Sequence, residues 1–187
     1  NAAQNERARR RADWTNVSST FIDHDIRALS DLSALQGMAD VVICTETIEH
    51  ILNDRKLMID IAGCLKPGGR LLMTAPYEHY KAITPEDDGP FSTFEDGGHV
   101  RRGYTAVTYR MLCEGAGLEI KEMAFCSGLT SQWLTKILRK FTVIEYRVGW
   151  LAILPLRILP PVLDPIISLT GLWPAYSITL IATKPKI

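Results

Sequence analysis

The stretch ADVVICTETIEHILND, residues 39–54, joins a continuous apolar run to a cluster of acids and a histidine. A short apolar run rich in β-branched residues is typical of a strand buried on both faces of a parallel sheet, so we predict a strand over 39–45. The run ends at Thr45 and Glu46, and Glu49 and His50 follow closely. Open parallel sheets bind ligands beyond the carboxyl ends of their strands. The polar cluster therefore lies where a ligand would bind.

The segments around this stretch alternate between strand and helix patterns. Apolar residues at helical spacing predict a helix over 54–65, and KPGG at 66–69 ends it, because proline and glycine continue a helix poorly. Residues 77–103 are rich in proline, glycine and acids and predict a long loop. Further strands are predicted at 17–22, 70–76, 119–127 and 175–184, and further helices at 2–12, 105–118 and 133–148. This order predicts an α/β fold with a mostly parallel sheet and helices on both faces.

Composition limits the class of protein. The 187 residues are enough for one domain, 1–187, and hydrophobic residues make up 47%. Lysine plus arginine equals aspartate plus glutamate at 21 each, which gives no global argument for binding nucleic acid. The four cysteines are widely spaced and form no CxxC pair, and no apolar leader follows the polar N-terminus. We expect reduced cysteines and a cytoplasmic protein.

A helical insertion, 128–174, is predicted before the last strand. The helix at 133–148 places apolar side chains on one face: Leu134, Ile137, Leu138, Phe141 and Ile144. The following segment, 149–173, is apolar but broken by four prolines, so it is a poor spanning helix. Two interpretations stay open. The insertion is a lid packed on the sheet, or 133–173 is a membrane-surface element that makes the protein membrane-associated.

Together these residues resemble a known family. The segments VSSTFIDHDIRAL (17–29), ADVVICTETIEHI (39–51), AGCLKPGGRLLMTAP (62–76) and GHVRRGYTAVTYRMLCEGAGLEI (98–120) are similar to class I S-adenosylmethionine-dependent methyltransferases. The branch that modifies quinones, sugars, lipids and other small molecules is most similar. The order TETIEHI then LKPGGRL is the most specific part. The resemblance implies a Rossmann-like methyltransferase fold and S-adenosylmethionine as cofactor.

The resemblance also implies roles for single residues around the cofactor. Asp25 matches the acid that accepts a hydrogen bond from the adenine amino group, and Ile26 matches the residue that flanks the adenine. Cys44, Thr45 and Glu46 match the wall along the sulfonium and methionine part. Asp25 also has a simpler interpretation, since an aspartate there can cap the following turn.

A second group of candidates concerns the acceptor. His50 matches the histidine at the mouth between cofactor and substrate, and His50 or His99 is the candidate general base, since an imidazole titrates near neutrality. The candidate acceptor-binding residues are Tyr77, His79, Tyr80 and Arg101. Glu49 could simply pair with a base or cap a helix, and the segment around His99 could be a salt-bridged loop. The spacing of the histidines along the chain gives no convincing metal set, so no metal is predicted.

Two features of the family are absent from the sequence. No G-x-G-x-G loop precedes residue 17, and no second strand ending in a ribose-binding acid is present. In the family strand order 3-2-1-4-5-7-6, the first two strands separate the strands predicted at 17–22 and 39–45. We therefore expect 39–45 to expose an apolar edge. A longer parent chain, or a partner chain in a homo-oligomer, would cover it.

The sequence therefore predicts a methyltransferase that acts on a small-molecule or lipid-linked acceptor, most simply on a hydroxyl group. Two alternatives stay open. One is a non-catalytic methyltransferase-like binding or scaffold module, which the missing glycine loop favours. The other is a peripheral membrane methyltransferase of a lipid-linked glycan or quinone, which the segment 133–173 favours.

Overall fold

The computed structural model describes residues 2–143 and 145–186, and it contains four strands and six α-helices in that part of the chain. The strands are β1 (Ala39–Thr45), β2 (Leu65–Pro76), β3 (Glu119–Cys126) and β4 (Ser177–Thr183). The α-helices are α1 (Ala2–Thr15), α2 (Asp54–Cys64), α3 (Ala106–Gly115), α4 (Leu129–Thr142), α5 (Tyr146–Ile153) and α6 (Leu159–Leu169). Short 3₁₀ helices lie at Ile26–Asp31, Ser33–Leu35, Ile48–His50, Pro85–Asp87 and Leu154–Leu156.

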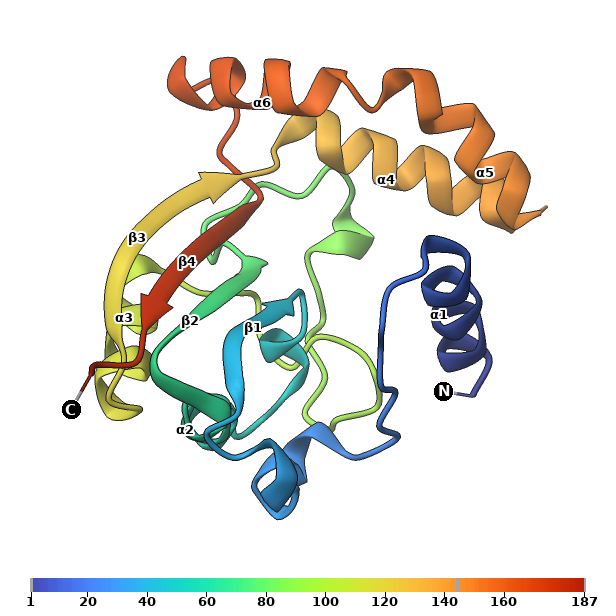
Figure 1. Cartoon of the computed structure of the whole chain (residues 1–187). Coiled ribbons are helices and arrows are strands. Elements are labelled where there is room, and N and C mark those ends of the chain that lie inside the picture. Colours follow the sequence, from blue (N-terminus) through green and yellow to red (C-terminus); the bar gives the residue numbers. More distant parts are fainter. Residues whose placement is uncertain (1, 144, 187) are drawn as a thin grey trace.

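The four strands form one sheet in the order β1-β2-β4-β3. β1 and β2 pair in parallel, whereas β4 is antiparallel to both β2 and β3. The predicted α/β fold with a mostly parallel sheet is confirmed, with β4 as the reversed strand. This order matches the 4-5-7-6 half of the family order. It brings the carboxyl ends of β1, β2 and β3 to the same edge of the sheet (Figure 1).

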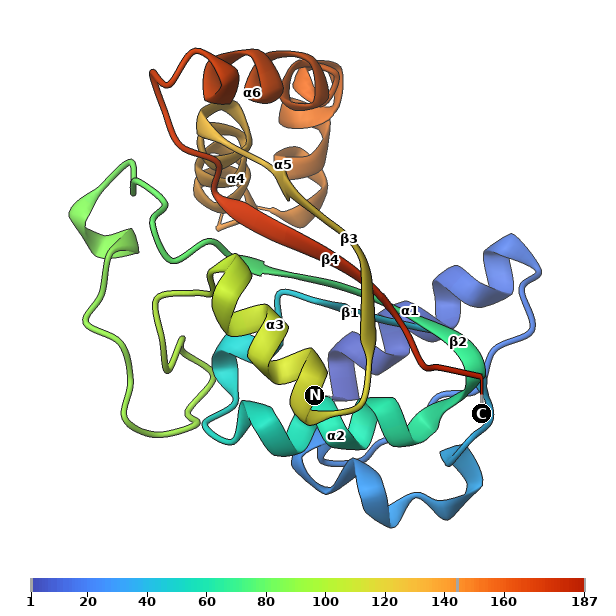
Figure 2. The same ribbon diagram turned by 90° about the vertical axis from the view of Figure 1, so that its left-hand side faces the viewer.

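Helices α2 and α3 cover one face of the sheet (Figure 2). Leu57, Met58 and Ile61 of α2 are buried against Leu71 and Met73 of β2 within the apolar core. On the opposite face of β1, Val41 and Ile43 are exposed, and Ile43 keeps 69% of its surface accessible. β1 is also one of the two edge strands of the described sheet. The predicted exposed apolar edge is therefore present.

Helix α3 begins at a fully formed capping box. Thr105 accepts a hydrogen bond from the Thr108 amide, and the Thr108 hydroxyl accepts one from the Thr105 amide. This reciprocal pair satisfies two amides that a helix start otherwise leaves free. Thr105 is therefore the N-cap of α3, at the start of the helix predicted over 105–118.

Three predicted elements differ from the structure. Residues 17–22 form no strand, because no neighbouring strand among the described residues supplies a ladder for them. KPGG at 66–69 lies inside β2 rather than in a turn, and a β-carbon on Gly69 would lie 2.9 Å from the carbonyl oxygen of Ala39. This close approach accompanies a register shift between the strands.

The helix predicted at 133–148 is also divided. α4 begins earlier, at Leu129, and ends at Thr142, and α5 begins at Tyr146. Ile144 lies outside the described residues, so its predicted place on the apolar face is not described. α4, α5 and α6 stack beyond the carboxyl end of the sheet (Figure 1).

Candidate functional site

A cavity of about 580 Å³ opens at the edge where the strands end. Its floor comes from the ends of all four strands: Glu46 after β1, Thr74 in β2, Ser127 after β3 and Ser177 in β4. The Glu46 amide donates a hydrogen bond to the Thr74 carbonyl at 2.9 Å, which continues the β1–β2 ladder to this point. Pockets of roughly 300–1,000 Å³ are typical of small-molecule sites. We call this hollow the strand-end cavity.

Helix α4 forms the opposite wall of the strand-end cavity. Its polar face contributes Ser131, Gln132, Thr135, Lys136 and Arg139. The Gln132 side chain is buried and donates to the Lys81 carbonyl at 3.1 Å. Residues predicted to form a lid therefore line the cavity.

Asp164 of α6 holds the start of α4 in place. One carboxylate oxygen accepts hydrogen bonds from the Thr130 amide and hydroxyl, at 2.7 and 2.6 Å. The other accepts from the Ser131 amide and hydroxyl, at 3.1 and 2.6 Å. Gly128, at the N-cap, supplies no side chain for these amides. A carboxylate at this end of a helix also interacts favourably with the helix dipole.

A carboxylate and two imidazoles meet within the cavity. Glu49 is fully buried, and neither of its carboxylate oxygens has a hydrogen-bond partner in the described part of the chain. His50 places Nε2 3.8 Å from the nearer oxygen, which is an ion-pair distance but too long for a hydrogen bond. The His50 and His99 rings lie edge to face with centroids 4.7 Å apart. We call Glu49, His50 and His99 the Glu49 cluster.

The surroundings shift the pKa values of groups that line the cavity. Burial, followed by the nearby charge of Glu46, raises the pKa of Glu49 to about 7. Burial also raises the pKa of Glu46, although the residue as a whole is exposed. Burial, then His50 and Arg139, lowers the pKa of His99, so its imidazole is neutral near pH 7. Such shifts are concentrated at functional sites.

Two backbone positions at the cavity are strained. Glu46 has φ of 47° and Ser127 has φ of 59°, in the left-handed region that favours glycine. Both residues directly follow a strand, and both line the strand-end cavity. Strain of this kind persists at functional sites, where it aims a side chain or an amide at a ligand.

The residues predicted to bind the cofactor are only partly brought to the cavity. Glu46 lines it, whereas Cys44 points into the core, where burial raises the pKa of its thiol to about 11. Thr45 is exposed at the end of β1. Asp25 is an exposed N-cap, and hydrogen bonds from Arg27 lower its pKa to about 2. Ile26 packs against the core beside it.

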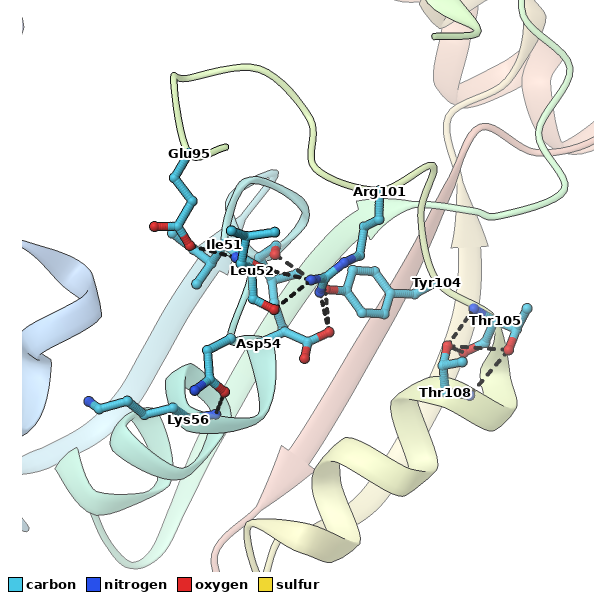
Figure 3. Close-up of polar contacts among 11 residues, drawn as sticks. Ile51, Leu52, Asp54, Lys56, Glu95, Arg101, Tyr104, Thr105 and Thr108 are labelled. Atoms are coloured by element: carbon cyan, nitrogen blue, oxygen red, sulfur yellow. Dashed lines mark hydrogen bonds and ion pairs between the residues drawn. The ribbon is translucent and has the colours of Figure 1, made fainter. Parts of the chain in front are cut away.

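Asp25 is nevertheless linked to the end of β1 through a short chain of contacts. Arg27 bonds both Asp25 and Glu95, and the second ion pair measures 2.8 Å. The other Glu95 oxygen accepts from the Leu52 amide at 2.6 Å (Figure 3). Glu95 therefore joins the Asp25 turn to the loop that follows His50.

Arg101 fixes the loop that precedes α2. Its guanidinium donates to the Asp54 carboxylate, to the Tyr104 hydroxyl and to the carbonyl oxygens of Ile51 and Leu52, the last two at 2.9 Å (Figure 3). These contacts use hydrogen-bond donors of the guanidinium for partners within the protein. Arg101 does not line the strand-end cavity, so its predicted role in binding an anionic acceptor stays a prediction.

The other predicted acceptor residues also lie outside the cavity lining. Tyr80 is buried, and its hydroxyl donates to the Asp87 carbonyl at 2.6 Å. Tyr77 contacts the rings of His79 and Phe125. His50, His99 and Glu46 are the predicted site residues that the fold does bring together in the cavity.

Sequence reasoning missed the contributions of α4 and of Ser127, Tyr176 and Ser177. These residues lie near Glu46 because the antiparallel strand β4 lies between β2 and β3 in the sheet. The position of Ser127 and Ser177 at the ends of predicted strands was a usable signal. The polar face of α4 had none, because a row of polar side chains is also what a solvated helix face shows.

Comparison with known proteins agrees with this geometry. The profile of a family described as a methyltransferase domain matches residues 2–122. A ubiquinone biosynthesis O-methyltransferase from Xanthomonas oryzae pv. oryzae is 36% identical over 58 residues, which are 30% of this chain and 24% of that protein. The chain thus matches about a quarter of the length of this curated relative.

Two solved structures share the fold. An O-methyltransferase from a trans-AT PKS multienzyme of Brevibacillus brevis, in complex with S-adenosyl-L-homocysteine, has a TM-score of 0.53 and 18% identity over 99% of this chain and 56% of that chain. The cyclase SpnF has a TM-score of 0.53 and 17% identity over 96% of this chain and 60% of that chain. The second protein is named a cyclase, so the fold alone does not fix the reaction.

Proposed function

Because the chain belongs to the methyltransferase domain family, we propose that it transfers the methyl group of S-adenosylmethionine to a hydroxyl of a small-molecule or lipid-linked acceptor. The observation that carries this proposal is the strand-end cavity, where Glu46 and the Glu49 cluster meet beyond the carboxyl end of β1. The ubiquinone biosynthesis O-methyltransferase that resembles part of the chain supports an oxygen acceptor.

Family membership implies S-adenosylmethionine as the methyl donor, and the residues present fit this group in two respects. The donor carries a positively charged sulfonium, and Glu46 and Glu49 place two carboxyls in the cavity. The strained backbone at Glu46 and Ser127 lies at the strand ends, where a ligand of this fold binds. Glu46 would lie along the charged part of the donor, and Asp25 and Ile26 would hold its adenine.

The chemical step is an in-line displacement. The acceptor oxygen forms a bond to the methyl carbon, the carbon–sulfur bond breaks, and S-adenosylhomocysteine leaves with the electron pair. The hydroxyl proton must also be removed. The protein contributes mainly by aligning the two reactants in the strand-end cavity. His50 and His99 act on the hydroxyl, either as neutral imidazoles that accept the proton or by holding a cation that acidifies it.

A methyl-transfer assay tests the proposal. The purified chain is incubated with S-adenosylmethionine and a panel of phenolic and polyprenylated phenolic acceptors, and S-adenosylhomocysteine and methylated product are measured by mass spectrometry. We expect equal amounts of both products with a hydroxylated acceptor and none with the matching methyl ether. Formation of a methylated amine in place of an ether would refute the hydroxyl assignment.

A second candidate, contact with a membrane surface, is favoured by α5 and α6. These helices and the short segment between them expose several aliphatic residues: Leu151, Leu154, Ile158, Val162, Ile166 and Leu169. Arg147 and Arg157 are exposed in the same segment of the chain. No single helix of the described ranges has the length and apolarity to span a membrane, but Arg147–Leu156 and Leu159–Leu169, bent by 58°, pass that test as a pair. We propose that this segment rests on an anionic bilayer, as basic amphipathic helices do.

Co-sedimentation with vesicles that contain phosphatidylserine tests the membrane proposal. Changing both Leu151 and Leu154 to serine removes two exposed apolar side chains and should lower partitioning by about tenfold or more. Val107→Ser with Met111→Ser is the control, because these residues are similarly exposed on α3, at 61% and 57% against 69% and 58%. Equal partitioning of the two double variants would refute the proposal.

A further inference from the structure

Glu49 is a buried acid whose carboxylate has no hydrogen-bond partner among the described residues. Its side chain has no accessible surface, and both carboxylate oxygens lack a hydrogen bond within the described residues. Its backbone is fixed, because the Val100 amide donates to the Glu49 carbonyl at 2.9 Å. Folded proteins rarely bury an unpaired carboxyl, since desolvation costs several kcal/mol that no contact offsets. The arrangement therefore points to a partner that binds from the cavity.

The two neighbouring imidazoles are positioned to share that partner. His50 Nδ1 lies 2.9 Å from the Gly98 carbonyl oxygen, so this nitrogen donates the hydrogen bond and carries the ring proton. The Nε2 lone pair is then free, and it faces Glu49. Metal-binding histidines commonly donate a hydrogen bond from their other ring nitrogen to a backbone carbonyl in this way. His99 adds a second ring at the edge of the first.

We propose that the Glu49 cluster holds one divalent transition-metal ion. One ligand atom from each of the three residues lies within 4.8 Å of the other two. Ligands bonded at about 2.0–2.2 Å lie about 3.0–3.4 Å apart, so side-chain rotations that shorten the longest separation by about 1.4–1.8 Å would complete the set. Two imidazoles and one carboxylate are a set that zinc and iron(II) enzymes use with coordination positions left open.

An ion pair between a protonated His50 and Glu49 is the simpler explanation for the cluster. It satisfies the geometry less well, because the 3.8 Å separation is too long for a hydrogen bond and the second carboxylate oxygen stays without a partner. It also gives His99 no part. A cation bound by all three side chains gives the Glu49 carboxylate a partner and gives His99 a role.

The metal site deepens the proposed function and rests on it in one respect. The Glu49 cluster lines the strand-end cavity, so Glu49, His50 and His99 would hold the ion beside the space where an acceptor would lie. An ion held there would supply Lewis-acid chemistry that makes an acceptor hydroxyl more acidic. His50 and His99 are then ligands, and the acceptor class is a molecule whose hydroxyl can reach the ion.

Calorimetric titration of the chelator-treated protein with Zn²⁺, Mn²⁺ and Mg²⁺ tests the site without donor or acceptor. We expect one equivalent of Zn²⁺ or Mn²⁺ to bind and to raise the melting temperature. Glu49→Gln and His99→Asn should each weaken binding at least 100-fold. His24→Asn is the control for surface histidines, because His24 is exposed and lies outside the cluster.

Two results would overturn the metal site: no binding of any of the three ions at millimolar concentration, or binding that both variants retain. Glu49→Gln keeps the shape of the side chain and removes an unpaired buried charge, so the metal-free variant should melt no lower than the wild type. Visible absorption of the Co²⁺-loaded wild type gives a check that depends on no variant. Binding of S-adenosylhomocysteine to the metal-free protein is measured separately, so failure of the metal site and failure of the methyltransferase proposal are distinguishable.

Discussion

Asp164→Asn is the change that should most clearly reveal how the α4 wall is held. The aspartate is 3% exposed and accepts four hydrogen bonds, two on each oxygen. Asparagine keeps the shape but turns one acceptor oxygen into a donor, so at least the amide of Thr130 or Ser131 loses its partner. A hydrogen bond to a charged group contributes about 1.5–3 kcal/mol, and the loss of charge weakens those that remain. We expect a loss of about 3 kcal/mol in the free energy of unfolding.

For a chain of this length, a change of 1 kcal/mol shifts the melting temperature by about 2–4 °C, so Asp164→Asn should lower it by roughly 6–12 °C. Circular dichroism measures the transition at pH 7. Asp40→Asn is the control, because Asp40 is 80% exposed and pairs with Lys66 at the surface, where such a pair contributes little. If the two variants melt within about 2 °C of each other, the argument that Asp164 anchors α4 is refuted.

Three further predictions concern the scaffold. Gly103→Ala should cost about 3 kcal/mol or more by denaturant titration, because the new β-carbon would lie 2.2 Å from the Pro76 carbonyl oxygen, and a smaller loss would show that the loop yields easily. Cys44 should react slowly with iodoacetamide at pH 8, as measured by mass spectrometry, because burial raises the pKa of its thiol to about 11. At any pH well below that value the residue stays in the unreactive thiol form. Labelling as fast as that of free cysteine would contradict its burial. Arg101→Lys should lower stability by about 2–3 kcal/mol in thermal melts, since lysine cannot reproduce the fork on Asp54 and two carbonyls, and an unchanged melting temperature would count against this clamp.

The fold was predictable from sequence wherever a local pattern determines structure. β1 has the predicted bounds, because an apolar run of that length between polar ends has few alternatives. The capping box at Thr105 is likewise a local signal. Residues 17–22 have the composition of a strand, yet strand formation depends on a neighbour, and the described residues contain none for it.

The candidate site was predictable only in part, since its parts come from distant segments. Glu46, His50 and His99 were identified from their position and chemistry, and the fold does bring them together. Glu49 was interpreted as the partner of a base or as a helix cap, because its complete burial follows from the loop around Val100 and from the core. The α4 wall depends on Asp164, a contact between residues more than thirty positions apart.

The measurement that tests the central claim most directly is calorimetric titration of S-adenosylhomocysteine into the chain, with Asp25→Ala, Glu46→Gln and the control Asp31→Ala. The claim is that Asp25 and Glu46 bind the methyl donor. We predict binding that each of the first two changes weakens about tenfold or more, as expected for loss of a charge-assisted contact, while Asp31→Ala, at the end of the same short helix, leaves it unchanged. Absence of binding, or binding that neither Asp25→Ala nor Glu46→Gln weakens, would contradict the claim.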